Sequence, residues 1–156
     1  MNEMRRRTLK AGGSAGLLAL LAAAGIVRPG EIFAADWNKA AFDVKNTQEA
    51  LKALGASGPA NSGDITIRAA DIAENGAVVP VGVESKIPGT QSISILIDKN
   101  PFPLAATFDI PPGTDPLVTT RIKMGQTSEV FALVKADGKF YVTKKEIKVT
   151  LGGCGG

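Results

Sequence analysis

Apolar and polar residues alternate with a period of two along most of the chain after residue 63. This period is typical of β-strands, because successive side chains of a strand point to opposite faces. The alternation is clear in residues 64–68, and Ile93, Ile95 and Ile97 repeat it within residues 92–98. The same reasoning predicts further strands at residues 77–84, 104–110, 117–124, 129–135, 139–143 and 147–151.

Turn-forming residues separate these strands. Residues 111–113, Pro-Pro-Gly, interrupt the pattern, and residues 136–139, Ala-Asp-Gly-Lys, are a hairpin turn signal. Pro80 lies inside one expected strand and indicates an edge strand or a bulge, because proline cannot donate a backbone hydrogen bond. Short strands at this spacing, with hardly any helix between them, predict a sandwich of antiparallel sheets over residues 64–151.

A helical pattern precedes the strands, within residues 36–63. Asn46 and Glu49 form a cap signal, and Gly55 ends the pattern. The apolar stripe between them consists of Ala50, Leu51 and Leu54. Residues 37–41 could add an earlier turn, and residues 56–63 are expected to be a loop or linker. This segment is expected to pack on the sandwich and to carry no chemistry of its own.

Residues 1–35 have the composition of an export signal. The segment Arg5-Arg6-Arg7-Thr8-Leu9-Lys10 is similar to a twin-arginine motif, and an apolar run that glycines interrupt follows over residues 11–27. We expect cleavage after Ala34 or Ala35 and a periplasmic location. A permanent membrane anchor is the alternative, but the run is slightly shorter than the roughly 20 apolar residues of a span.

The charge balance changes once this signal is set aside. Of the 18 Lys and Arg and the 15 Asp and Glu, five and two lie in residues 1–35, which leaves 13 of each sign. The formal net charge of the remaining chain is zero, so the positive balance belongs to the signal. No nucleic-acid partner is expected.

The residues after the signal offer little for catalysis. The chain has no histidine and one cysteine, so a histidine-based triad and a His or Cys metal site are excluded, and no metal or other resident cofactor is expected. The acidic residues are scattered near expected turns: Asp71, Glu74, Asp98, Asp109, Asp115 and Asp137. We therefore expect a scaffold without an enzyme activity. Twin-arginine export carries folded cargo, which favours a second subunit that is exported together with this chain.

The candidate site is the C-terminus, residues 152–156. Cys154 is the single cysteine, and Gly152 and Gly153 precede it while Gly155 and Gly156 follow it. Glycine adopts backbone angles closed to other residues, so such an arm bends freely and enters narrow channels. An exposed thiol is an oxidation hazard, which favours a use for it as a covalent attachment point. Activation is expected from a partner's pocket, since the terminal carboxylate disfavours the thiolate.

Four segments of the chain resemble the SoxY family of the thiosulfate-oxidising Sox system. The most specific is the ending, Val-Thr-Leu-Gly-Gly-Cys-Gly-Gly, at residues 149–156; the others are residues 73–81, 100–108 and 121–128. The resemblance implies an all-β, immunoglobulin-like sandwich that forms a heterodimer with a SoxZ-like sandwich subunit. It further implies a swinging arm that holds sulfur intermediates on Cys154.

In this family, other proteins carry out the chemistry. A c-type cytochrome joins thiosulfate to the cysteine oxidatively, a hydrolase releases sulfate, and a sulfane dehydrogenase oxidises the remaining persulfide. The resemblance implies that this chain catalyses none of these steps. It also implies that the four glycines allow the arm to enter the channel of each partner enzyme.

Two other classes stay open from the residues alone. Some carriers hold sulfur as a thiocarboxylate on a C-terminal glycine, although those are ubiquitin-like proteins without an export signal. A structural sandwich could use Cys154 only for a disulfide-linked dimer. The position of the adduct distinguishes the three classes.

Overall fold

The computed structural model describes residues 38–151, which lie within one of two units of the chain, Asn38–Gly156. The predicted signal segment and the arm at residues 152–156 lie outside the described residues. The helices are α2 (Lys39–Asp43) and α3 (Thr47–Ala53). The strands are β1 (Ala60–Asn61), β2 (Ile65–Arg68), β3 (Ile72–Asn75), β4 (Val79–Ser85), β5 (Thr90–Ile97), β6 (Leu104–Asp109), β7 (Leu117–Ile122), β8 (Ser128–Ala136) and β9 (Lys139–Leu151).

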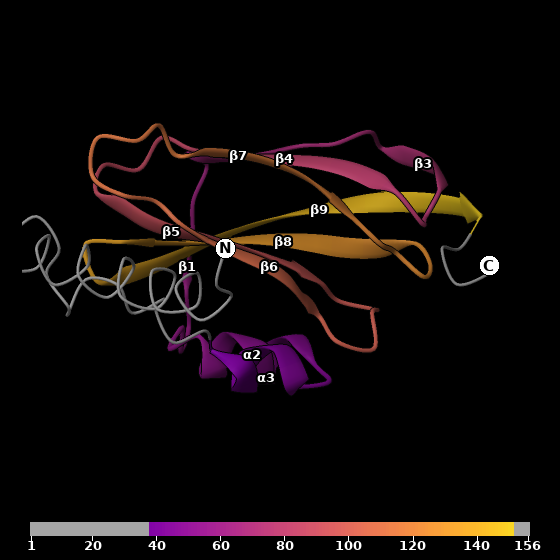
Figure 1. Ribbon diagram of the computed structural model, residues 1–156, viewed down its shortest axis with the longest axis horizontal. Coiled ribbons are helices and arrows are strands. Elements are labelled where there is room, and N and C mark those ends of the chain that lie inside the picture. The colour runs from indigo at the N-terminus through magenta and orange to yellow at the C-terminus, as the bar shows by residue number, and fades with distance from the viewer. Residues whose placement is uncertain (1–37, 152–156) are drawn as a thin grey trace, which may run out of the picture. The chain divides into compact units, whose positions relative to one another are not determined.

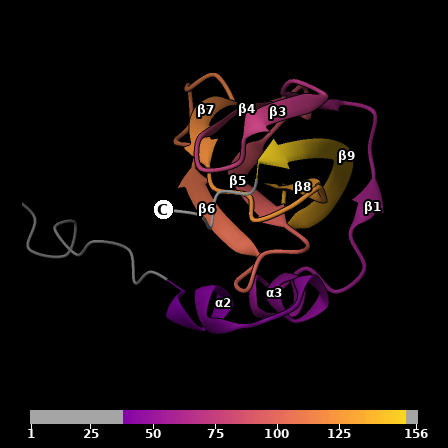
Figure 2. The same ribbon diagram turned by 90° about the vertical axis from the view of Figure 1, so that its right-hand side faces the viewer.

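These strands form two sheets that pack face to face (Figure 1). The larger sheet has the order β1-β9-β8-β5-β6, with β3 also pairing with β9, and the smaller has the order β2-β4-β7. Figure 2 shows the smaller sheet above the larger one and the helices below. The predicted immunoglobulin-like β-sandwich is confirmed. It is antiparallel apart from the parallel pairings of β1 and β3 with β9.

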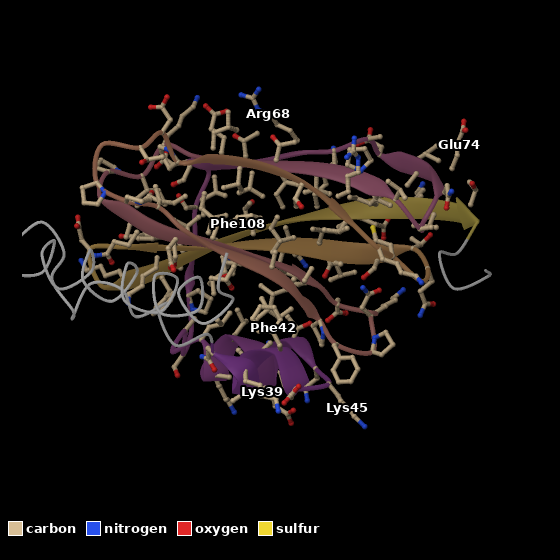
Figure 3. All side chains as sticks on the ribbon, viewed as in Figure 1. Lys39, Phe42, Lys45, Arg68, Glu74 and Phe108 are labelled. Atoms are coloured by element: carbon tan, nitrogen blue, oxygen red, sulfur yellow. The ribbon has the colours of Figure 1, made fainter. Side chains whose placement is uncertain are left out.

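The core lies between the sheets and consists of the apolar positions of the alternating pattern. Ile93 and Ile95 have no exposed surface and Ile97 has 1%. Burial of each such side chain stabilises the fold by roughly 1.5–3 kcal/mol. Phe108 of β6 is partly buried and packs against this cluster (Figure 3). Met124 is also fully buried in it, which agrees with a packing role.

The two helices cover the outer face of the larger sheet (Figure 1). The amide nitrogen of Glu49 donates a 2.8 Å hydrogen bond to the side chain of Asn46, so the predicted cap of α3 is confirmed. Gly55, with a φ of +82°, follows its end. Phe42 points from α2 toward the sheet, whereas Lys39 points away from it (Figure 3). The apolar faces of the helices pack on Leu96, Leu104 and Leu133.

The turn prediction was correct, whereas the prediction of an edge strand or a bulge at Pro80 was wrong. Asp137 (φ 47°) and Gly138 (φ 74°) form the two-residue turn between β8 and β9. Pro80 lies in β4, which is the middle strand of its sheet and not an edge. However, β2 pairs only with Gly82–Ser85, so Pro80 faces a strand partner on one side only.

One strand prediction was wrong, and two short strands were missed, one of them within residues 56–63, which were expected to be a loop or linker. Residues 139–143 and 147–151 were predicted as two strands, but β9 is one strand of 13 residues. The charged residues 144–146, which interrupt the apolar alternation, continue its pairing with β8. The short strands β1 and β3 were not predicted, because neither shows a clear alternation of its own. They form because β9 offers them a sheet edge.

Candidate functional site

Cys154 and its four glycines lie outside the described residues, so their role stays a prediction. What the structure describes is the strand that carries them. β9 ends at Leu151, three residues before Cys154. The tip of β9 lies beside β3 at one end of the sandwich (Figure 1). The last residues of β9 are therefore the root of the proposed arm, and we call residues 148–151 the arm root.

The arm root extends beyond the end of β8, the strand that pairs with the preceding part of β9. The last pair between β8 and β9 joins Ser128 to Ile147. After this point β9 pairs with β3 in parallel, with Ile72 opposite Lys148, Ala73 opposite Val149 and Asn75 opposite Leu151. The short strand β3 is thus what keeps the arm root in a sheet.

Three hydrogen bonds outside the regular ladder fix the arm root further. The amide nitrogen of Lys148 donates to the carbonyl oxygen of Asp71 at 2.9 Å. The amide nitrogen of Val149 donates to the hydroxyl of Thr127 at 3.0 Å. The hydroxyl of Thr150 donates to the carbonyl oxygen of Glu74 at 3.0 Å. The root is therefore held both from β3 and from the segment that leads into β8.

Packing connects the arm root to the core. Ile147 is fully buried, and Ala73, opposite Val149, is 9% exposed. Val149 packs against the same core cluster. An arm attached here starts from a strand that packs on the core and is hydrogen-bonded to its neighbours.

The lysines near the root have partners in the body. Lys144 pairs with Glu129 at 2.7 Å, and Lys145 pairs with Asp71 at 2.9 Å. Lys145 also donates a 2.5 Å hydrogen bond to the carbonyl oxygen of Ala69. These contacts hold both ammonium groups against the body. They therefore give no support to an activation of the Cys154 thiol by these lysines.

The ion pair changes the acidity of Asp71. The hydrogen bond from Lys145 and the positive charge of that lysine lower the pKa of the Asp71 carboxyl. Desolvation opposes this to a smaller extent, and Lys148 adds a weak attraction. Because Asp71 directly precedes β3, the pair connects the start of β3 to β9.

The acidic residues named above from the sequence are all exposed: Asp71, Glu74, Asp98, Asp109, Asp115 and Asp137. Within residues 38–151, no group of three or more His, Cys, Asp or Glu is placed to hold a metal ion. Neither α2 nor α3 is long and apolar enough to cross a membrane.

The sequence reasoning missed β3, which is the element that positions the arm root. Its residues, Ile-Ala-Glu-Asn, contain one buried position and no sustained pattern. The only available signal was the apolar pair Ile72 and Ala73 between Asp71 and Glu74, which is too short to define a strand.

Comparison with known proteins identifies the family. The model of the family described as "Sulfur oxidation protein SoxY" matches residues 50–154, a range that ends on Cys154. The structure is similar to that of the sulfur carrier protein SoxY from Chlorobium limicola f thiosulfatophilum. That similarity has a TM-score of 0.60 and 42% identity, and it covers 66% of this chain and 94% of the Chlorobium chain.

Other similarities are weaker. An engineered protein matches with a TM-score of 0.41 and 15% identity over 56% of this chain and 20% of its own. The endo-beta-1,4-mannanase from Thermotoga petrophila matches with a TM-score of 0.41 and 11% identity. This match covers 66% of this chain and 22% of the mannanase chain. These two support no functional conclusion. None of the curated proteins matches the chain. The family model and the Chlorobium structure agree, and the chain therefore belongs to the SoxY family of sulfur oxidation proteins.

Proposed function

We propose that this chain is a periplasmic sulfur carrier that holds thiosulfate-derived intermediates on Cys154 and presents them to partner enzymes. The observation that carries the proposal is the position of Cys154. It is the single cysteine of the chain, and it follows by three residues a strand end that is fixed to the core. The match to the SoxY family extends to this residue.

The loading step is an oxidation. The thiol of Cys154 loses its proton, a bond forms between its sulfur and the outer sulfur of thiosulfate, and two electrons leave to a c-type cytochrome. The product is a cysteine S-thiosulfonate. The exposed acids of the body have no role in this step, so the partner supplies both the activation and the electron acceptor.

The unloading steps are hydrolyses separated by one further oxidation. Water cleaves the terminal sulfur–sulfur bond of the adduct, which releases sulfate and leaves a persulfide on Cys154. A sulfane dehydrogenase removes six electrons from the outer sulfur while three waters supply the oxygens. A second hydrolysis releases sulfate and restores the thiol. The carrier contributes the attachment point and its delivery, and it catalyses none of these steps.

A second sandwich subunit of the SoxZ kind is part of the proposal. Twin-arginine export, which the leader of the sequence favours, would carry the folded pair to the periplasm. Gly152, Gly153, Gly155 and Gly156 would let the arm enter channels too narrow for larger side chains.

The test is intact-mass spectrometry of the protein from the periplasm of its own host, purified without reductant. Fragmentation of the C-terminal peptide locates any added mass. We expect masses of one S2O3 group and of single sulfur atoms on Cys154, both lost on reduction, together with a co-purifying small subunit. Sulfur on the terminal carboxyl, or only a disulfide between two copies, would contradict the proposal.

A further inference from the structure

The residues that the structure describes contain five asparagines, and one of them, Asn75, precedes a glycine. The others are Asn38, Asn46, Asn61 and Asn100. An asparagine deamidates when the backbone nitrogen of the next residue attacks the carbon of its side-chain amide. A glycine in the next position favours this attack, because it has no side chain to hinder the ring that forms. By sequence, Asn75 is therefore the first candidate for the reaction.

The side chain of Asn75 is placed for this attack. Asn75 is the last residue of β3, and its side chain is exposed in the turn that leads to β4. The side-chain oxygen accepts a 2.8 Å hydrogen bond from the amide nitrogen of Ala77. This bond to the second residue onward folds the side-chain amide back along the backbone of Gly76, which carries the attacking nitrogen.

The nitrogen of Gly76 is not held by the sheets. Among residues 38–151 it donates a hydrogen bond to no acceptor, whereas the carbonyl oxygen of Gly76 accepts one from the amide nitrogen of Met124 at 2.7 Å. A nitrogen without an acceptor loses its proton to hydroxide more readily than one whose proton is held in a hydrogen bond. Gly76 is itself buried, so the folded chain should react more slowly than an unfolded one.

Two of the other asparagines precede a nitrogen that is not free to react. The nitrogen after Asn61 belongs to Ser62 and donates a 3.1 Å hydrogen bond to the carbonyl oxygen of Val142. Asn100 is followed by Pro101, whose nitrogen carries no proton. Neither residue therefore offers the nucleophile that Gly76 supplies.

The remaining two asparagines cap the helices α2 and α3. Asn38 precedes Lys39, and its side-chain nitrogen donates a 2.7 Å hydrogen bond to the carbonyl oxygen of Ala53, which a carboxylate could not replace. Asn46 precedes Thr47, which is buried and branched at Cβ, so its side chain hinders ring formation. The structure thus leaves one asparagine of the five open to reaction.

We propose that Asn75 is a site of spontaneous deamidation in the folded protein. The nitrogen of Gly76 loses its proton and bonds to the side-chain carbon of Asn75, and ammonia leaves. The product is a cyclic succinimide, which one water molecule then opens on either side to give aspartate or isoaspartate. The reaction needs no oxidant, enzyme or partner, so this inference does not depend on the carrier function proposed above.

Isoaspartate would change the end of β3. Its main chain runs through the former side-chain carbon, so the backbone gains a methylene group between this position and Gly76. Asn75 forms the last pair of β3 with β9, opposite Leu151. The new carboxylate would also lie next in sequence to the exposed Glu74. We therefore expect the pairing that supports the arm root to weaken when isoaspartate forms.

The experiment follows the folded protein during incubation at mildly alkaline pH. Trypsin cleaves after Arg68 and Lys86, so peptide 69–86 contains Asn75 as its single asparagine, and peptide 53–68 contains Asn61 in the same way. Mass spectrometry detects the change from an amide to a carboxyl group in each peptide. A sample digested before incubation corrects for conversion during digestion.

We expect peptide 69–86 to convert at least about tenfold faster than peptide 53–68, because one hydrogen bond of the kind that Ser62 makes accounts for up to about a factor of ten. The converted peptide should separate into an aspartate and an isoaspartate form. Equal rates for the two peptides would overturn the proposal. So would an unconverted peptide 69–86 from the folded chain when the same chain converts in denaturant.

The variant Asn75→Asp separates the new charge from the longer backbone. It carries the carboxylate from the start, keeps an oxygen that accepts from Ala77, and leaves the main chain unchanged. Amide hydrogen exchange in β3 should be faster in the incubated protein that contains isoaspartate than in Asn75→Asp. Equal exchange in the two would overturn the expected effect on the arm root.

Discussion

The hydroxyl of Thr150 donates a 3.0 Å hydrogen bond to the backbone carbonyl oxygen of Glu74. Thr150 belongs to the last residues of β9, and Glu74 belongs to β3, the strand that supports them. This bond joins two segments 76 residues apart in the sequence. It lies at the end of the pairing between β3 and β9, where the proposed arm begins.

Replacing Thr150 by valine tests this connection. Thr150→Val keeps the shape of the side chain and removes the hydroxyl, so we expect a loss of about 0.5–1.5 kcal/mol in the free energy of unfolding. Amide hydrogen exchange should become faster in β3 and in the arm root and stay unchanged in β5. Thr119→Val, on the exposed side of β7, is the control. Unchanged exchange in β3 would show that the bond does not hold the arm root.

Replacing Cys154 by serine tests the proposed attachment point. We expect Cys154→Ser to fold with an unchanged circular dichroism spectrum and melting temperature, because the residue lies beyond the last strand. Thiosulfate oxidation should fall to the level without carrier when the other proteins are supplied. Turnover at the normal rate would show that sulfur is carried elsewhere.

The core can be tested with two isoleucines of opposite exposure. Ile93 has no exposed surface, whereas Ile72 is 56% exposed. We expect Ile93→Ala to lower the free energy of unfolding by about 2–5 kcal/mol, because it removes buried methyl groups and leaves a cavity. Ile72→Ala should change it by about 0.5 kcal/mol or less. Chemical denaturation measures both, and similar losses would contradict the burial described here.

The ion pair of Asp71 and Lys145 predicts a dependence on pH. The pKa of Asp71 is lowered in the folded chain, so its contribution to stability is present above the unfolded value, about 3.9. It is lost as the pH falls through the folded pKa. Asp71→Asn should therefore be less stable than the unmodified protein at neutral pH, and the difference should vanish in strong acid.

Asp71 is exposed, so this difference should be small and should decrease in high salt. Asp115→Asn, another exposed acid, serves as the control. A difference that grows as the solution becomes acidic would mean that the sign of the effect is wrong. Melting temperatures across a pH series distinguish these outcomes.

Local patterns were sufficient for most of the secondary structure. Strands such as β5 and β8 were predictable because apolar residues recur at every second position on the face toward the other sheet, although the helices also bury part of their outer face. The cap at Asn46 and the turn at Asp137 and Gly138 were predictable because each depends on a few adjacent residues. The family ending at residues 149–156 indicated the candidate site in the same way.

The sequence by itself determined the two-residue period, the helical caps, the hairpin turn and the chemistry of a single cysteine among glycines. Each of these depends on residues that are neighbours in the chain. Only the tertiary structure decided that β9 is one continuous strand and that β3 joins its end in parallel. It also decided that Ile72 lies opposite Lys148 of the arm root. The pairing of β3 with β9 brings together segments more than 70 residues apart, and the short strand β3 forms only because the edge of β9 is there to pair with it.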